Sequence, residues 1–315
     1  MKKFNAAVWG AGGYVGKELT SILSDHPHIG EIYAVSTSHT DATDSADIAF
    51  LALPHGSSAP VAELLQATQP HTTVIDLSGD LRFKNPQTYE EWYQMAHPAP
   101  DVLEQGVPYC LPELFPIPKE AGIYSMPGCY PTASLLSTVP LIEAGIVKPS
   151  TQIDVDAVSG VSGLGKNFPQ GAELVMKLGM EVPYKTGRVH QHVGEIEQFL
   201  GGASIYFSPA LGPFFRGIIA TCALPNTNDT TTEALVDYLK DYYAEHELVQ
   251  ILPVGEKPAV ENVVGTDRCD IGAVATMHTI EITSCIDNLR KGAAGQAVQT
   301  FNILRDVPET TGLNL

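Results

Sequence analysis

Gly10-Ala11-Gly12-Gly13-Tyr14-Val15-Gly16 is the stretch of this sequence that decides the fold. It follows the apolar run 4–9, which predicts a strand, and opens the run 14–24, whose apolar residues have helical spacing. Glycines in this place let the backbone turn tightly and approach a pyrophosphate at the positive end of the helix. The alternative is a glycine-rich turn that only packs the helix onto the strand. The candidate cofactor-binding residues are Gly10, Gly12, Gly13, Tyr14, Val15 and Gly16.

Apolar runs and helix-like stretches alternate through the first 80 residues. Further strands are predicted at 32–36, 48–53 and 73–77. Strands separated by helices are typical of parallel βαβ units, so we expect an α/β fold with a Rossmann-type, doubly wound parallel sheet. Ser36 and Ser38 lie at the end of the second predicted strand, where an NAD site has a carboxylate that binds the ribose 2′-hydroxyl. Serine hydroxyls can accommodate a 2′-phosphate, so these residues favour NADP.

The pattern changes beyond Cys129, where a helix and several separate strands indicate an α+β domain with a mixed sheet. We expect residues 1–128 to form an NADP-binding Rossmann domain, completed by a C-terminal helix in 286–315. Residues 129–285 then form a catalytic and oligomerisation domain.

Composition excludes several classes of protein. The 315 residues include 18 basic and 36 acidic side chains, for a net charge of −18, so binding to nucleic acid through the overall field is not expected. No apolar stretch approaches the roughly 18 residues that span a bilayer, and we expect a soluble, cytoplasmic protein. Five cysteines without a CxxC pair argue against a disulfide framework and a zinc knuckle.

A second glycine loop, residues 160–166, resembles a phosphate-binding P-loop because it ends in Gly165-Lys166. The next residue is Asn167, whereas a P-loop needs a Ser or Thr hydroxyl for magnesium. We therefore reject an ATPase or kinase. The loop can still bind an anionic substrate, through its backbone N–H groups and Lys166.

Cys129 is the candidate nucleophile. It precedes a predicted helix with Pro131 near the first turn, and a helix N-terminus stabilises a thiolate. The best candidate base lies in the segment His190-Gln191-His192, with Glu195 to orient the histidine. Two alternatives stay open: the histidines cap a helix, or they hold a metal.

These residues together resemble the N-acetyl-γ-glutamyl-phosphate reductases of arginine biosynthesis, within the wider aspartate-semialdehyde dehydrogenase group. The resemblance runs nearly end to end. It is carried by the first glycine loop and by the blocks 50–56, 76–82, 127–132, 159–166, 190–195, 287–296 and 309–313. Gly12, Met126, Gln191 and Lys166 depart from the family pattern.

The resemblance implies a nucleophile at Cys129, an acid/base at His190 with Glu195 as its partner, and NADPH as the hydride donor. It also implies cofactor contacts at Pro54 and Asn288. The substrate-binding residues expected from the second glycine loop and from local cations are Ser159, Gly160, Lys166, Arg188 and Arg216.

The implied reaction reduces an acyl phosphate to a semialdehyde through a cysteine thioester, in a homo-oligomer that is a dimer or tetramer. One rival is a relative that reduces aspartyl phosphate or a lysine-pathway intermediate. Another is a dinucleotide-binding redox sensor without turnover.

Overall fold

The computed structural model describes residues 2–35, 45–166 and 169–315. The chain divides into two compact units. The first unit comprises Met1–Gly128 and Ala293–Leu313, and the second comprises Cys129–Gly292 and Asn314–Leu315.

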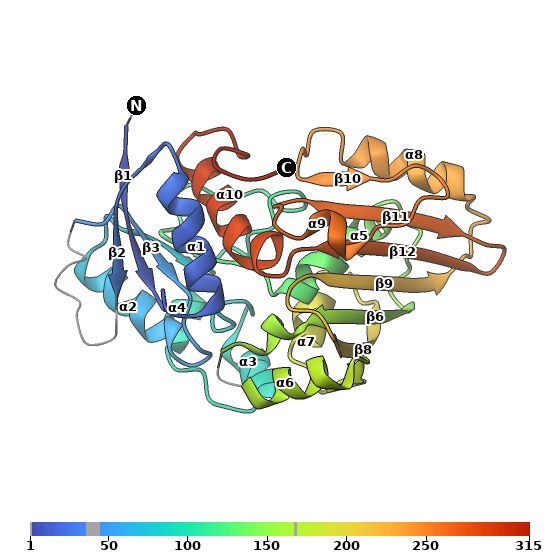
Figure 1. Cartoon of the computed structure of the whole chain (residues 1–315), viewed down its shortest axis with the longest axis horizontal. Helices are drawn as coiled ribbons and strands as arrows, with labels where there is room; N and C mark the ends of the chain where they lie inside the picture. Colours follow the sequence, from blue (N-terminus) through green and yellow to red (C-terminus); the bar gives the residue numbers. More distant parts are fainter. Residues whose placement is uncertain (1, 36–44, 167–168) are drawn as a thin grey trace. The chain divides into compact units, whose positions relative to one another are not determined.

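The first unit is built on a five-stranded sheet in the order β2-β1-β3-β4-β5, and every pair in it is parallel (Figure 1). Its strands are β1 (Phe4–Trp9), β2 (Ile29–Val35), β3 (Ile48–Leu51), β4 (Thr73–Asp76) and β5 (Ile123–Ser125). The strand order reverses at β1, which lies between β2 and β3. Open parallel sheets bind their ligands at such a switch point, beyond the carboxyl ends of the strands. The Rossmann-type parallel sheet predicted from the sequence is confirmed.

Helices cover both faces of this sheet. They are α1 (Tyr14–Asp25) and α10 (Gly295–Leu304) on one face and α2 (Ser58–Thr68) and α4 (Pro100–Glu104) on the other, and α3 (Pro86–Tyr93) packs on α4. One core joins Leu19 of α1 and Phe301 of α10 to Val8 of β1. A second core packs Ala62 of α2 against Leu51 of β3. The C-terminal helix α10 thus belongs to the core of the first unit.

The second unit is built on a seven-stranded mixed sheet in the order β10-β11-β12-β9-β6-β8-β7. The pairs β10/β11 and β6/β8 are parallel and the others are antiparallel, so the expected mixed sheet is confirmed. Its strands are β6 (Gln152–Gly160), β7 (Val182–Pro183), β8 (Ser204–Gly212), β9 (Ile218–Pro225), β10 (Val249–Ile251), β11 (Cys269–Ala275) and β12 (Thr279–Ile286). Its helical segments are α5 (Cys129–Glu143), η2 (Val161–Leu164), α6 (Pro169–Leu178), α7 (His192–Glu197), α8 (Thr232–Tyr242) and α9 (Val260–Val263), and η3 (Arg290–Ala294) leads into α10.

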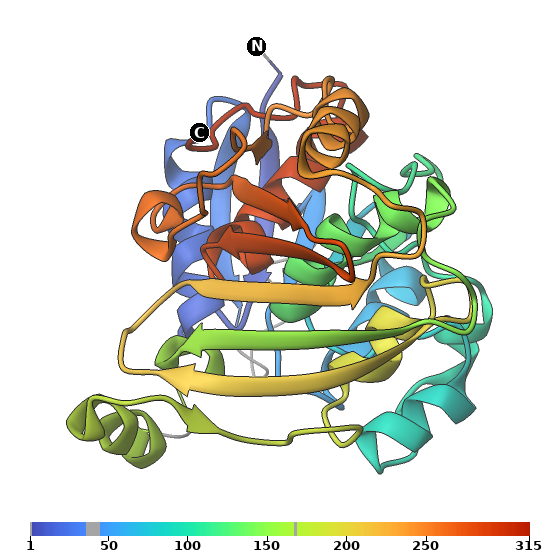
Figure 2. The same ribbon diagram turned by 90° about the vertical axis from the view of Figure 1, so that its right-hand side faces the viewer.

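Helices α5, α7 and α8 pack on one face of the mixed sheet. On β6, Ile153 and Val155 are buried beneath them, while Asp154 and Asp156 point the other way and are exposed. Figure 2 looks onto the opposite face, where β9, β6 and β8 lie in front of the helices and no helix of the described chain covers them.

Helix α5 is buried along almost its whole length, although Pro140 lies inside it. Proline has no N–H, so the carbonyl four residues earlier loses its helical partner. The Tyr243 hydroxyl, just beyond α8, donates to that carbonyl of Leu136 at 2.7 Å. Since a buried carbonyl must be paired, this bond lets the helix run through its proline.

Among the described residues, no helix is long and apolar enough to cross a membrane.

Candidate active site

The first glycine loop joins β1 to α1 with little space to spare at two of its glycines. Gly10 has a φ of +76°, and a Cβ there would lie 2.1 Å from the Ala52 carbonyl oxygen. A Cβ on Gly16 would lie 2.2 Å from the Gly10 carbonyl oxygen. By contrast, a Cβ on Gly12 would meet nothing within 4 Å. Helix α1 begins at Tyr14, with no acidic residue in its first turn. This loop suits the close approach of a pyrophosphate.

Pro54 lies at the same edge of the sheet, in the loop that follows β3. That loop is joined to the end of β1 by the Ala52 N–H, which donates to the Trp9 carbonyl at 3.0 Å. The glycine loop and the β3–α2 loop therefore lie side by side at the switch point, where open parallel sheets bind their ligands. Ser36 and Ser38 lie outside the described residues.

Cys129 is the first residue of α5 and is half-buried. The other cysteines are fully buried. Burial raises the pKa of Cys110, Cys222 and Cys285 to about 12, which keeps these three as thiols at neutral pH. Cys129 therefore has the position that a nucleophile needs, at a helix N-terminus and with access to solvent.

Aromatic rings surround Tyr130, the residue after Cys129. The Tyr130 ring has its centroid 5.9 Å from each of the His190 and His192 rings. The Tyr184 hydroxyl donates to the Tyr130 hydroxyl at 3.2 Å. Burial raises the pKa of Tyr184 to about 12 and raises that of Tyr130 as well, so both hydroxyls stay protonated at neutral pH.

The two histidines have different partners. The Nδ1 atom of His190 accepts the backbone N–H of His192, the first residue of α7, at 3.1 Å. Nε2 of His192 lies 3.9 Å from the carboxylate of Glu195, which is 1% exposed. His190 thus accepts the first backbone N–H of α7, which is a contact that a structural role would use. Among the described residues, no group of three or more His, Cys, Asp or Glu side chains is placed to hold a metal.

Asn288, which follows strand β12, binds the second glycine loop. The Asn288 side-chain oxygen accepts the Gly217 N–H at 2.7 Å, and its amide nitrogen donates to the Ser162 hydroxyl at 2.9 Å. Ser159 donates to the Gly160 carbonyl at 3.0 Å. A Cβ on Gly160 would lie 2.6 Å from the Phe215 carbonyl oxygen, so the loop packs directly on the backbone of 215–216. These contacts give Asn288 a structural task within the second unit; the cofactor contact stays a prediction.

The predicted substrate cations differ in how they are held. Arg188 makes two bonds to Glu197, at 2.5 and 2.8 Å. Arg216 pairs with the buried Asp287 at 2.9 Å. Lys166 is exposed at the end of its loop. A substrate anion at Arg188 would compete with a bidentate carboxylate, whereas an anion at Arg216 would join an existing pair.

Sequence reasoning did not single out Tyr184, Glu197 or Asp287. Tyr184 precedes His190 by six residues without any local pattern that marks it, and Asp287 reaches Arg216 from 71 residues away. Only Tyr130, as the neighbour of Cys129, carried a local signal.

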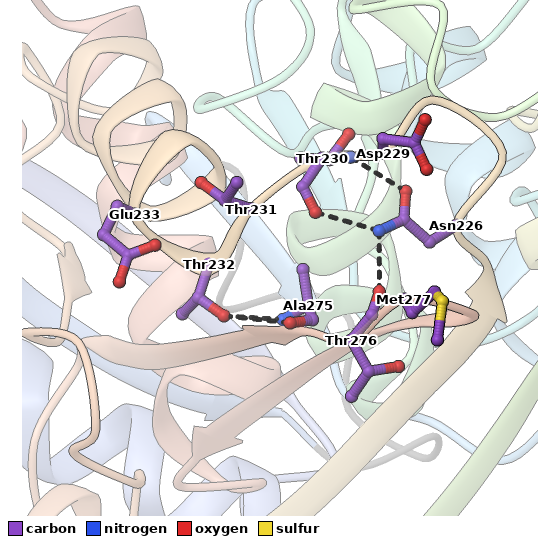
Figure 3. A pocket seen from close by; sticks show the side chains of 9 residues that line it. All are labelled: Asn226, Asp229, Thr230, Thr231, Thr232, Glu233, Ala275, Thr276 and Met277. Carbon is purple, nitrogen blue, oxygen red and sulfur yellow. Dashed lines mark hydrogen bonds between the residues drawn. The ribbon is translucent and has the colours of Figure 1, made fainter.

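A separate surface pocket opens where α8 begins (Figure 3). The Asn226 amide donates to the Thr230 and Thr276 carbonyls at 2.8 Å each, and Thr231 caps the helix. Its polar groups bind one another and so hold the turn together.

Two family models match the chain. The semialdehyde dehydrogenase NAD binding domain matches residues 35–120, and the semialdehyde dehydrogenase dimerisation domain matches residues 129–288. An N-acetyl-γ-glutamyl-phosphate reductase of Symbiobacterium thermophilum is 37% identical over 96% of this chain and 95% of its own. One from Bacillus amyloliquefaciens is 39% identical, over 97% of this chain and 96% of its own. The chain belongs to the N-acetyl-γ-glutamyl-phosphate reductase family.

The fold of this N-acetyl-γ-glutamyl-phosphate reductase family member also matches more distant solved structures. Aspartate semialdehyde dehydrogenase II of Vibrio cholerae superposes with a TM-score of 0.74 at 19% identity, covering 97% of this chain and 99% of that one. The enzyme of Candida albicans, solved with NADP, gives a TM-score of 0.64 at 15% identity, over 96% and 99% of the two chains. The resemblance read from the sequence is confirmed.

Proposed function

We propose that this chain reduces N-acetyl-γ-glutamyl phosphate to N-acetylglutamate semialdehyde with NADPH and releases phosphate. The observation that carries the proposal is the similarity over nearly the full length to relatives of that name, at up to 39% identity. The placement of Cys129 at the start of α5 supports it, because acyl transfer needs a nucleophile that can form a thiolate.

In the proposed reaction the Cys129 thiolate attacks the acyl carbonyl, the carbon–oxygen bond to phosphate breaks, and a thioester remains on the sulfur. Bound NADPH supplies the hydride that reduces this thioester. The carbon–sulfur bond then breaks, the semialdehyde leaves and His190 returns a proton to the sulfur. Since Nδ1 of His190 accepts a backbone N–H, Nε2 is the nitrogen through which it exchanges that proton.

The residues that hold the cofactor in this proposal are those of the first glycine loop, with Pro54 beside it. The preference for NADP over NAD depends on Ser36 and Ser38. For the substrate, Lys166, Arg188 and Arg216 supply the positive charge that an acyl phosphate needs in a chain with a net charge of −18.

The subunits are proposed to associate through the uncovered face of the mixed sheet, since this sheet lies within the stretch that matches a dimerisation domain. A cytoplasmic location stays a prediction.

The test is phosphate-dependent reduction of NADP⁺ with N-acetylglutamate semialdehyde, the reverse reaction, alongside aspartate semialdehyde as the rival substrate. Cys129→Ser is expected to abolish turnover while NADP⁺ binding stays close to wild type, because the thiolate does chemistry and does not hold the cofactor. Cys222→Ala, at a buried cysteine of the same unit, is the matched control and should stay active. Faster turnover of aspartate semialdehyde would favour the rival reductase, and binding without any turnover would favour the redox sensor.

A further inference from the structure

His55 links the ends of two neighbouring strands of the parallel sheet. It lies in the loop after β3, and its Nδ1 accepts the backbone N–H of Gly79, which follows β4, at 3.2 Å. Its ring also packs on that of Tyr93 in an edge-to-face arrangement, with the ring centroids 4.9 Å apart. Gly79 is buried and His55 is exposed, and in this partly buried contact the imidazole supplies the acceptor for the Gly79 N–H.

The backbone at Gly79 leaves no room for a side chain. A Cβ on Gly79 would lie 1.8 Å from the Tyr93 hydroxyl and 2.8 Å from His55 Nδ1. Gly56, the residue after His55, has a φ of +83°, a conformation that glycine adopts without strain. The turn 54–56 is therefore shaped by its sequence and packed against the loop after β4.

Asp80 fixes the other end of the same turn. Its buried carboxylate accepts the N–H groups of Gly56 at 2.7 Å and of Ser58, the first residue of α2, at 3.0 Å. Because Gly79 and Asp80 are adjacent, the loop after β4 holds the turn at two points, one through His55 and one through the start of α2.

The 54–56 turn lies at the switch point of the parallel sheet. Pro54 precedes His55 directly, and the carbonyl of Ala52 lies so close to Gly10 that no Cβ would fit there. A shift of the 54–56 turn would therefore move the backbone beside the glycine loop, at the place where the loop binds its ligand.

We propose that His55 is a positioning residue for the nicotinamide dinucleotide. By accepting the Gly79 N–H through Nδ1, it holds the β3–α2 loop at the distance from the glycine loop that the dinucleotide requires. The inference rests on the proposed function only in that the chain binds a nicotinamide dinucleotide.

The experiment compares His55→Ala with His55→Asn in the full-length protein. Asparagine places its side-chain oxygen near the position of Nδ1 and can accept the Gly79 N–H, whereas alanine cannot. Binding of NADP⁺ is titrated by tryptophan fluorescence, since both tryptophans, Trp9 and Trp92, lie in the first unit. His55→Ala is expected to weaken binding by roughly 3- to 10-fold, as for the loss of one hydrogen bond, and His55→Asn by less than about twofold.

A wild-type protein that binds NADP⁺, with unchanged affinity in His55→Ala, would overturn this inference and leave the proposed function intact. Equal losses in both variants would also overturn it, because the acceptor would then not be what matters. If thermal melting shows His55→Ala to be unfolded, His55→Gln replaces it, since its amide lies at the position of Nε2 and cannot reach Gly79. If the wild-type protein bound neither NADP⁺ nor NAD⁺, both the proposed function and the role of His55 would be overturned.

Discussion

At the scale of single residues, the structure separates what His190 does for the fold from what it can do in chemistry. Its Nδ1 accepts the backbone N–H of His192 at the start of α7, just before which Gln191 is the N-cap, and the same ring lies beside Tyr130. A substitution that preserves this contact and removes Nε2 therefore tests the chemistry alone. Asparagine does this, because its side-chain oxygen can accept the backbone N–H two residues on, as in an Asx turn.

His190→Asn is expected to slow turnover by roughly 10²- to 10⁴-fold, the usual contribution of a positioned acid or base, with little change in melting temperature. The matched control is His192→Asn, measured by kcat and by thermal melting. A larger loss at His192 would reverse the assignment and make the His192–Glu195 pair the acid/base, since these two side chains already lie 3.9 Å apart. Small losses in both, with lowered stability, would favour a capping role only.

At the scale of elements, the first glycine loop allows a matched pair of substitutions. Gly16→Ala places a Cβ 2.2 Å from the Gly10 carbonyl oxygen, so either the start of α1 or the loop must move. Overpacking of this kind costs about 1–3 kcal/mol, and we expect NADP⁺ binding to weaken by at least about fivefold. The Cβ of Gly12→Ala meets no protein atom within 4 Å, so binding should weaken less than in Gly16→Ala. Equal titration curves for the two variants would contradict this account of the loop.

Helix α5 offers a second test at this scale. Tyr243→Phe removes the donor to the Leu136 carbonyl and leaves a buried acceptor unpaired, at a cost of about 1–3 kcal/mol in the free energy of unfolding. Adding Pro140→Ala to that variant restores a backbone N–H opposite the same carbonyl. The double variant should therefore unfold at higher urea concentration than Tyr243→Phe, and a further loss of stability instead would show that the hydroxyl contributes by another route.

The elements were predictable where their signals are local. The glycine loop and the start of α5 at Cys129 follow from neighbouring residues, and the structure places both as expected. Strand β2 begins at Ile29, three residues before the predicted start, because pairing with β1 extends a strand beyond its apolar run. The partners of the cations were not predictable. Arg216 meets Asp287 across 71 residues because β9 and β12 pair in a register that no local pattern specifies.

At the scale of the whole molecule, helices cover one face of the mixed sheet, whereas on its other face no described helix covers β9, β6 and β8 (Figure 2). Tyr206 on β8 and Val274 on β11 are large apolar side chains of that second face, and they are 46% and 39% exposed. Asp154 and Asp156 lie on the same face, in a chain with a net charge of −18. Two copies that meet here bury the tyrosines and bring like charges together, so we expect association to strengthen as salt screens the carboxylates.

Tyr206→Glu adds a negative charge to this acidic face in each copy, and in a two-fold interface every substitution acts twice. The wild type is expected to have a solution mass at least twice its 33.7 kDa by light scattering, and Tyr206→Glu to shift toward 33.7 kDa. Leu64→Glu, at a residue of α2 in the first unit that is 51% exposed, is the matched control and should keep the wild-type mass. If Tyr206→Glu leaves the mass unchanged, or if Leu64→Glu lowers it equally, the subunits associate through a surface other than this sheet.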